Sequence, residues 1–143
     1  MIAKSQMMPM ALIACPAFRE SWNKHRQFWQ DEEAGIYNDL AEFADFIVDQ
    51  AYGSGDLASV DASFALTERF FDEGDDEVRE AAMIGFLEDV HNLSSHRPFG
   101  AAPFIERLGP LSKRAWAEVE EMWRGKNSLA DVIRGERKAR EKS

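Results

Sequence analysis

The amino-acid sequence predicts an all-α fold, a single domain of about five to six helices. Apolar residues recur at helical spacing along most of the chain, and no stretch shows the sustained apolar-polar alternation of a half-buried strand. The length of 143 residues, with ten Phe and four Trp, suffices for one hydrophobic core and not for two. We therefore expect one domain over residues 1–133, arranged as an irregular bundle or as a short α-solenoid of helical hairpins.

The first predicted helix covers residues 16–30. Pro16 suits the first turn of a helix, because a missing N–H leaves nothing unpaired there. Phe18, Trp22 and Trp29 then fall on one apolar stripe.

A second helix is predicted over residues 31–52. Asp31, Glu32 and Glu33 suit its N-terminus, where the helix dipole is positive. The apolar positions that follow at helical spacing are Ile36, Leu40, Phe43 and Ile47. The glycines of "YGSGD" end this helix.

The third and fourth predicted helices meet at an acid-rich junction. The third covers about residues 57–72, and Gly74 closes it. Asp75 or Asp76 caps the fourth helix, which extends over residues 76–93.

A loop, a helix and a tail are predicted for the remaining part of the chain. The segment "SSHRPFGAAPF", residues 94–104, is a loop because prolines and a glycine lie close together. Pro110 opens the next helix, which ends near residue 124, and a last short helix spans 129–137. The basic segment "RGERKAREKS", residues 134–143, is expected to be a frayed or disordered tail.

Composition and charge exclude several classes of function. Against 17 basic residues the chain has 26 acidic ones, a net charge of -9, which suits a basic protein partner and opposes binding to nucleic acid. Solubility alone would explain the same charge. No apolar run approaches the roughly 20 residues needed to cross a bilayer, so no membrane partner is expected.

Cys15 is the one cysteine of the chain, so it cannot form an internal disulfide, and a reducing cytoplasm is the expected compartment. An alternative stays open, because residues 12–15 have the form of a lipoprotein processing site that would export the chain. Against export, the apolar stretch is short, is interrupted by Pro9, and has no polar tether after it.

Five carboxylates lie within the six positions from 72 to 77, namely Asp72, Glu73, Asp75, Asp76 and Glu77. Their spacing does not match an EF-hand calcium loop, which needs alternating acids, a central glycine and a final glutamate. Acids at the start of a helix are stabilised by its dipole, so we expect the cluster to be first of all a helix junction. Its second expected role is a docking surface for a basic partner.

The sequence shows no complete metal or catalytic constellation, and neither a metal nor another cofactor is predicted. Glu88 and His91 have the Glu-x-x-His spacing of di-iron bundles, but a second such pair is missing. His91 is instead expected to cap the end of its helix, where a cation suits the dipole. Cys15 is expected to serve packing, because no strained turn or oxyanion-forming glycine stretch flanks it.

Trp116 and Trp123 lie on one apolar stripe of the helix that Pro110 opens, with Val119 between them. We expect them to close the core. If one of them is exposed beside the acids, it becomes a hot spot for a protein interface, so Trp123 joins the five acids as a candidate partner-binding residue.

A resemblance to a known family rests on four segments: "CPAFRESW", "YNDLAEFADFIVD", "FALTERFFDEGDDEVREAAMIGFLEDVHN" and "LGPLSKRAWAEVEEMW". They resemble a poorly characterised family of small, acidic, all-helical bacterial proteins, with a Cys-Pro start, a central Gly-Phe-Leu-Glu and a Trp-bearing C-terminal helix. The matching residues are Cys15, Pro16, Gly85, Phe86, Leu87, Glu88 and Trp123. Such proteins are similar to immunity proteins encoded beside polymorphic toxins. The resemblance implies association with a toxin and assigns no catalytic residue, and the basic tail departs from the family pattern.

The leading hypothesis is a cytoplasmic, non-enzymatic binding protein, most specifically an immunity-like inhibitor of a basic toxin or effector, present as a monomer or homodimer. An acidic face would steer the cationic partner, and a few desolvated aromatic residues would hold it. One alternative is a small metal-dependent hydrolase that uses Glu88, His91 and Cys15. Another is a helical scaffold that self-associates through Trp116 and Trp123.

Overall fold

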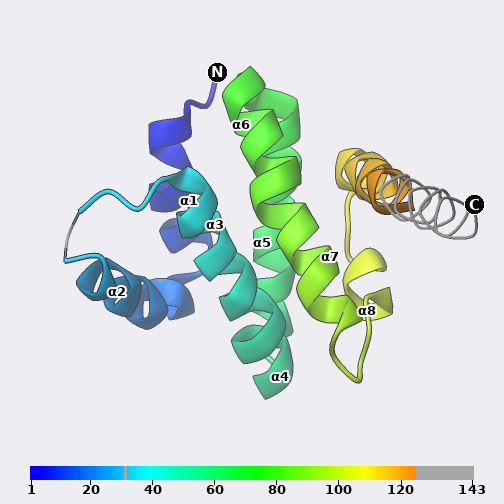
Figure 1. The fold of residues 1–143 in the computed structure, drawn as a ribbon, viewed down its shortest axis with the longest axis horizontal. Coiled ribbons are helices and arrows are strands. Elements are labelled where there is room, and N and C mark those ends of the chain that lie inside the picture. The colour runs from blue at the N-terminus through cyan, green and yellow to red at the C-terminus, as the bar shows by residue number, and fades with distance from the viewer. Residues whose placement is uncertain (31, 125–143) are drawn as a thin grey trace, which may run out of the picture.

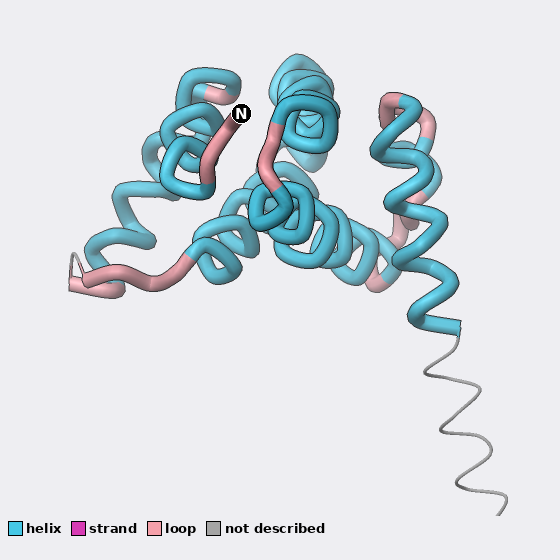
Figure 2. Tube along the Cα trace, turned by 90° about the horizontal axis from the view of Figure 1, so that it is seen from above, coloured by secondary structure: helices cyan, strands magenta, loops and turns pink. Residues whose placement is uncertain are grey.

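The computed structural model describes residues 1–30 and 32–124, and Figure 1 shows them as one packed bundle of helices. In this part of the chain no β-strand forms, and the β-type pairing is an isolated bridge between Ile2 and Gly74. Figure 2 shows the bundle from above, with its helices joined by loops and turns. The predicted all-α fold is confirmed, and of the two predicted arrangements the bundle is the one found.

The N-terminal stretch forms a helix that the sequence did not predict. A 3-10 turn (Lys4–Gln6) leads into α1 (Met7–Ala14). Apolar residues lie on every side of α1, so no helical periodicity marks it in the sequence. Met7 and Cys15 are completely buried, and α1 packs against the long helix α5 (Leu57–Glu73). The stretch before Cys15 therefore belongs to the core of the domain.

The first predicted helix is found at the expected place. A 3-10 turn (Pro16–Phe18) is followed by α2 (Arg19–Phe28). Phe18 is completely buried, and its ring centroid lies 6.1 Å from that of Trp22. Trp29, the third member of the predicted stripe, follows α2 as its C-cap and is half-buried.

The second predicted helix begins later than expected. Helix α3 (Ile36–Asp45) starts at residue 36 because Gly35, with a φ of 93°, turns the chain out of the helical conformation just before it. The prediction that Glu32 and Glu33 form the helix start is wrong, since both lie in the connection before α3. Asp31 lies outside the described residues.

Two π-type stretches interrupt the regular helices, and the sequence predicted neither. The stretch Phe46–Ala51 continues α3 into the short helix α4 (Tyr52–Ser54). The stretch Ala81–Leu87 joins α6 (Asp76–Glu80) to α7 (Glu88–Ser95). The fourth predicted helix is therefore confirmed as one helical rod with a wider turn at its centre.

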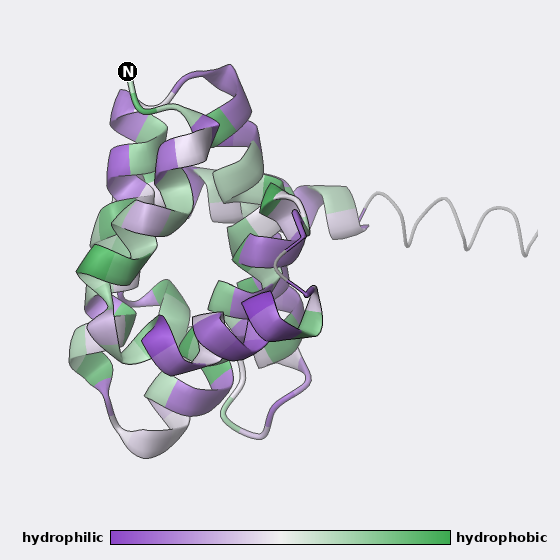
Figure 3. Ribbon diagram, turned by 90° about the vertical axis from the view of Figure 1, so that its left-hand side faces the viewer, coloured by the Kyte–Doolittle hydropathy of each residue, from purple (hydrophilic) through white to green (hydrophobic). Residues whose placement is uncertain are grey.

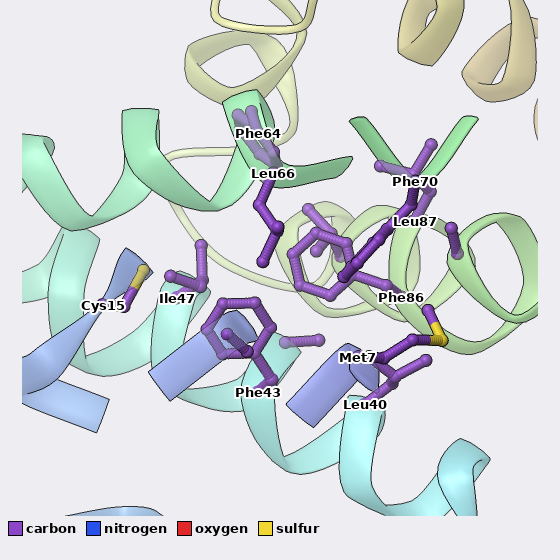
Figure 4. Packing of buried hydrophobic residues seen from close by; sticks show 14 of the residues in the cluster. Met7, Cys15, Leu40, Phe43, Ile47, Phe64, Leu66, Phe70, Phe86 and Leu87 are labelled. Atoms are coloured by element: carbon purple, nitrogen blue, oxygen red, sulfur yellow. The ribbon is translucent and has the colours of Figure 1, made fainter. Parts of the chain in front are cut away.

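The core forms where α3 lies against the π-type stretch 81–87. A Cβ atom at Gly85 would lie 3.1 Å from a methyl group of Leu40, so the missing side chain lets these two segments approach closely. Figure 4 shows the aromatic and aliphatic side chains that fill this region. Among them, the ring centroids of Phe43 and Phe86 lie 5.2 Å apart in a stacked arrangement.

One carboxylate of α5 fixes the start of the last described helix. After the short helix α8 (Ala102–Ile105), this helix begins at Pro110 as predicted and continues to residue 124. The backbone N–H groups of Leu111 and Ser112 donate to Glu68 at 2.8 and 3.0 Å, which satisfies two of the donors at the helix start. Burial raises the pKa of Glu68, but these hydrogen bonds outweigh it and hold the pKa below its ordinary value.

Trp116 and Val119 point into the core from this helix, with exposed fractions of 3% and 1%. The prediction that Trp116 closes the core is confirmed. The predicted helix over 129–137 and the predicted tail over 134–143 lie outside the described residues.

Candidate functional site

The junction acids, Asp72, Glu73, Asp75, Asp76 and Glu77, lie between α5 and α6 as predicted. Asp75 is the N-cap of α6, and its carboxylate accepts a hydrogen bond of 2.9 Å from the N–H of Val78. Gly74 ends α5, and a Cβ atom there would lie 2.4 Å from the carbonyl oxygen of Phe70. The prediction of a glycine-closed, aspartate-capped helix junction is confirmed.

The N-terminal segment covers part of this junction. The N–H of Ile2 donates to the carbonyl of Glu73 at 2.8 Å, and the N–H of Asp75 donates to the carbonyl of Ile2 at 3.0 Å. These two bonds form the isolated bridge, which ties the beginning of the chain to its middle (Figure 1). The junction backbone is therefore hydrogen-bonded to the N-terminal segment on either side of Gly74, at Glu73 and at Asp75.

Most of the junction acids already have a cationic neighbour. The pairs are Glu73 with Arg69 at 2.8 Å, Glu77 with Lys4 at 3.4 Å, and Asp76 with Arg79 at 3.9 Å. Each pair is exposed, so it contributes little to stability, but it offsets charge locally. Within residues 1–30 and 32–124, Asp72 is the junction acid with neither a capping role nor an ion pair.

Trp123, the sixth predicted partner-binding residue, does not join the junction acids. It is half-buried on the helix over 110–124, whose end points away from α6 in Figure 1. The partner role of these six residues stays a prediction, and the structure places them on two separate parts of the surface. Trp116 is buried, so self-association through this helix would depend on Trp123 and on its exposed neighbour Met122.

Cys15, one residue of the hydrolase alternative, lies in the core. Cys15 is completely buried, and its thiol donates to the carbonyl of Ser59 at 3.4 Å. Burial, with a smaller contribution from Asp56, raises the pKa of the Cys15 thiol to about 11. The thiol is therefore protonated at neutral pH, whereas the thiolate is the nucleophile.

His91 does not cap the end of its helix, and this prediction is wrong. Its ring centroid lies 5.0 Å from that of Trp116, and its Nε2 lies 3.9 Å from a carboxylate oxygen of Glu120. The helix continues to Ser95, and His96 occupies the C-cap. His91 therefore fills the contact between α7 and the last helix, because it faces inward one turn before the end.

Among the described residues, no three His, Cys, Asp or Glu side chains are grouped so that they could hold a metal ion. No helix within 1–30 and 32–124 combines the length and the apolar content needed to span a membrane.

A second acidic surface lies between α3 and α7, and the sequence did not predict it. We call its members, Glu42, Asp45, Glu88 and Asp89, the interhelical acids. Burial, followed by the charges of Asp45 and Glu88, raises the pKa of Asp89 to about 6. Burial and the neighbouring Glu42 and Asp49 likewise raise the pKa of Asp45. Negative charge in this region is therefore crowded.

The arginine whose charge acts on Asp45 is already bound to another carboxylate. Arg97 donates through Nε and Nη2 to both oxygens of Asp49, at 2.7 and 2.8 Å. This pairing lowers the pKa of Asp49 and only partly counteracts the rise at Asp45. Within the described part of the chain, no lysine or arginine forms an ion pair with the four interhelical acids.

Next to the interhelical acids lies a cleft between α2 and α3 with a volume of about 440 Å³. His25 is one of the residues that line it, with an exposed fraction of 8%. Its Nε2 lies 2.8 Å from a carboxylate oxygen of Asp39, and because a carboxylate only accepts, Nε2 carries the hydrogen. Its Nδ1 faces Glu42 at 3.9 Å, so the cleft and the interhelical acids are continuous through Glu42.

Only part of this second surface had a signal in the sequence. Glu42, Asp45 and Asp49 recur at spacings of three and four, which places them on one face of a helix. Their proximity to Asp89 depends on the packing of α3 against the rod from α6 to α7, which no local pattern encodes. Figure 3 shows hydrophilic residues spread over many helices, so hydrophilic character alone does not single out this face.

The fold and these surfaces define a small all-α domain with two acidic regions. A family model matches residues 8–124, and the family is described as a domain of unknown function (DUF7674). The match covers most of the chain, so the chain belongs to this family. No curated protein and no solved structure shows a significant match.

Proposed function

We propose that the protein is a non-enzymatic binding module that takes a basic protein partner on the interhelical acids. The observation that carries this proposal is the crowding of Glu42, Asp45, Glu88 and Asp89, where burial and mutual repulsion raise the pKa of two carboxyls. The protonated, buried thiol of Cys15 supports the non-enzymatic part of the proposal.

A cationic partner would relieve this crowding. Repulsion among carboxylates that share a partly desolvated site disfavours their charged forms, and an arginine or lysine of a partner would offset that penalty on binding. The same charges would attract the partner from a distance and raise the association rate. The junction acids provide a weaker version of this effect, because their charges are already offset by Arg69, Lys4 and Arg79.

The more specific proposal is an immunity-like inhibitor of a basic toxin or effector. It is supported by the resemblance in sequence, by the net charge of -9, and by an acidic surface formed by two packed helices. Inhibition would follow from covering the functional surface of the toxin, which requires no chemistry from this chain.

Two variants with equal numbers of removed charges test which acidic surface binds. The first carries Glu42→Gln, Asp45→Asn, Glu88→Gln and Asp89→Asn. The second carries Asp72→Asn, Glu73→Gln, Asp76→Asn and Glu77→Gln, and it keeps Asp75 because that residue caps α6. Tagged wild-type and variant chains are used to capture proteins from the native cell lysate at low and raised salt, and bound proteins are identified by mass spectrometry.

We expect one stoichiometric basic partner on the wild-type chain and on the junction variant, released by salt and lost from the interhelical variant. Loss from the junction variant instead would move the binding face to residues 72–77. If the same partner is captured by the wild-type chain and by both variants, at low and at raised salt, the acidic-face mechanism is contradicted. The inhibitor proposal then predicts that the isolated partner is toxic when expressed alone and harmless when expressed with this chain.

A further inference from the structure

The cleft between α2 and α3 combines the two chemical features that a guanidinium group recognises. Its aromatic side is formed by Phe28 and Trp29, and its anionic side by Glu42 and Asp45. Phe28 is 80% exposed, so its ring is accessible to a partner at the cleft. This arrangement differs from a plain acidic cluster, because a cavity and an exposed ring accompany the charges.

The chain itself already places an arginine against an aromatic ring of the same helix. The guanidinium carbon of Arg26 lies 6.0 Å from the ring centroid of Trp22, within the range of a cation-π contact. A planar guanidinium can stack on an aromatic ring and also donate in parallel to a carboxylate, whereas an ammonium group acts as a compact point charge. The cleft offers both kinds of contact side by side.

The walls of the cleft are already held in place by internal contacts. Asn38 donates to the carbonyl of Ala34 at 2.8 Å, and His25 is fixed by its contact with Asp39. Lys24 also lines the cleft, but its side chain is exposed and lies 3.4 Å from Glu20, so its charge is partly offset. Glu42 and Asp45 therefore keep the anionic side available.

We infer that this cleft receives an arginine side chain of the basic partner, with the guanidinium between the aromatic and the carboxylate sides. The inference rests on the proposed function and names the kind of residue through which the partner would be anchored. Arginine is one of the residues enriched at the hot spots of protein interfaces, where it fills a desolvated pocket.

The test uses N-acetyl-arginine amide as the probe and the full chain labelled with nitrogen-15. The citrulline analogue has nearly the same shape but no charge. The lysine analogue has the positive charge but lacks the planar guanidinium group. The reporters are the backbone signals of α3 and the indole N–H signal of Trp29, assigned by the loss of that signal in Trp29→Phe. Sodium chloride at matched ionic strength controls for general screening.

We expect saturable shifts at these reporters with the arginine probe, at a dissociation constant on the order of millimolar, since a single small ligand has few contacts. Citrulline should give none, and lysine should bind roughly fivefold more weakly or worse. Asp45→Asn should weaken arginine binding roughly fivefold. Glu77→Gln at the junction is the matched control and should leave binding unchanged.

Equal shifts with arginine and citrulline, or no shift up to tens of millimolar, would overturn the inference, as would arginine binding unaltered by Asp45→Asn. Preservation of the wild-type spectrum outside the cleft shows that Asp45→Asn is folded. If a basic partner is captured through the interhelical acids while the arginine probe fails, the proposed function stands and the arginine cleft does not.

Discussion

The junction acids and the interhelical acids differ in how the chain uses the same chemical group. At the junction, residues adjacent in sequence cap a helix or pair with a nearby cation. Between α3 and α7, carboxylates separated by more than forty positions are brought together without such partners. A dense run of acids in a sequence is therefore a poor guide to unsatisfied charge in the folded protein.

The largest effect on stability is expected at Gly74, where the junction leaves no space for a side chain. Gly74→Ala should lower the free energy of unfolding by about 2 kcal/mol, because the added Cβ would overlap the carbonyl oxygen of Phe70 and the side chain of Val78. Urea denaturation measures the change. Gly53→Ala is the matched control, since a Cβ there meets nothing within 4 Å, and equal stability of the two variants would contradict the close packing at Gly74.

Removing the cap of α6 should give the next effect. Asp75→Ala should destabilise the protein by about 1 kcal/mol, because the N–H of Val78 loses its acceptor. Asp75→Asn should recover most of this loss, since an amide oxygen can also cap a helix. Asp72→Ala, at the neighbouring exposed position, should cause no loss in the same urea titration.

The interhelical acids should respond in the opposite direction. Asp89→Asn should raise the free energy of unfolding at neutral pH by roughly 1 kcal/mol, a value reduced for solvent screening at this half-buried site. The sign follows from the raised pKa: the folded protein binds this proton below about pH 6, whereas the unfolded chain binds it only near 3.8. The penalty on the wild-type protein is therefore full above pH 6 and is lost as the pH falls towards 3.8.

Urea titrations at a series of pH values distinguish this effect from a general one. The advantage of Asp89→Asn should shrink steadily as the wild-type carboxyl becomes protonated. If Asp89→Asn stabilises the protein equally at every pH, the difference in free energy of unfolding between the variant and the wild type arises from packing and not from charge.

The smallest effect is expected for the exposed pair at the junction. Glu73→Gln removes the ion pair with Arg69, whose partners are both largely exposed, and the thermal unfolding midpoint should stay within experimental error. A clear loss of stability at low salt would mean that the junction pairs act as a coupled network.

Local patterns were sufficient for most of the helices. Gly74, Asp75 and Pro110 mark helix ends through their own backbone chemistry, so their positions could be read directly. Helix α1 was not predicted, because a segment that is apolar on all sides shows no helical periodicity in the sequence. The start of α3 was misplaced because acids favour a helix N-terminus but do not oblige the chain to begin one there.

The candidate site was less predictable, because it depends on contacts between distant segments. The raised pKa of Asp89 needs Asp45 from another helix, and the position of His91 needs Trp116 from the last one. The π-type stretch 81–87 packs against α3, and the close approach at Gly85 involves Leu40 from that other helix. None of these relations has a signature within one helical turn of sequence.

The bridge between Ile2 and Gly74 also sets an order of events during synthesis on the ribosome. The first residues cannot reach their final partner until residue 74 has emerged, a delay of roughly 4 to 14 s at ordinary rates of translation. Through this interval the Met-rich stretch of α1 has no α5 to cover it. For that time the nascent chain presents an exposed apolar segment to any chaperone or targeting factor that scans emerging polypeptides.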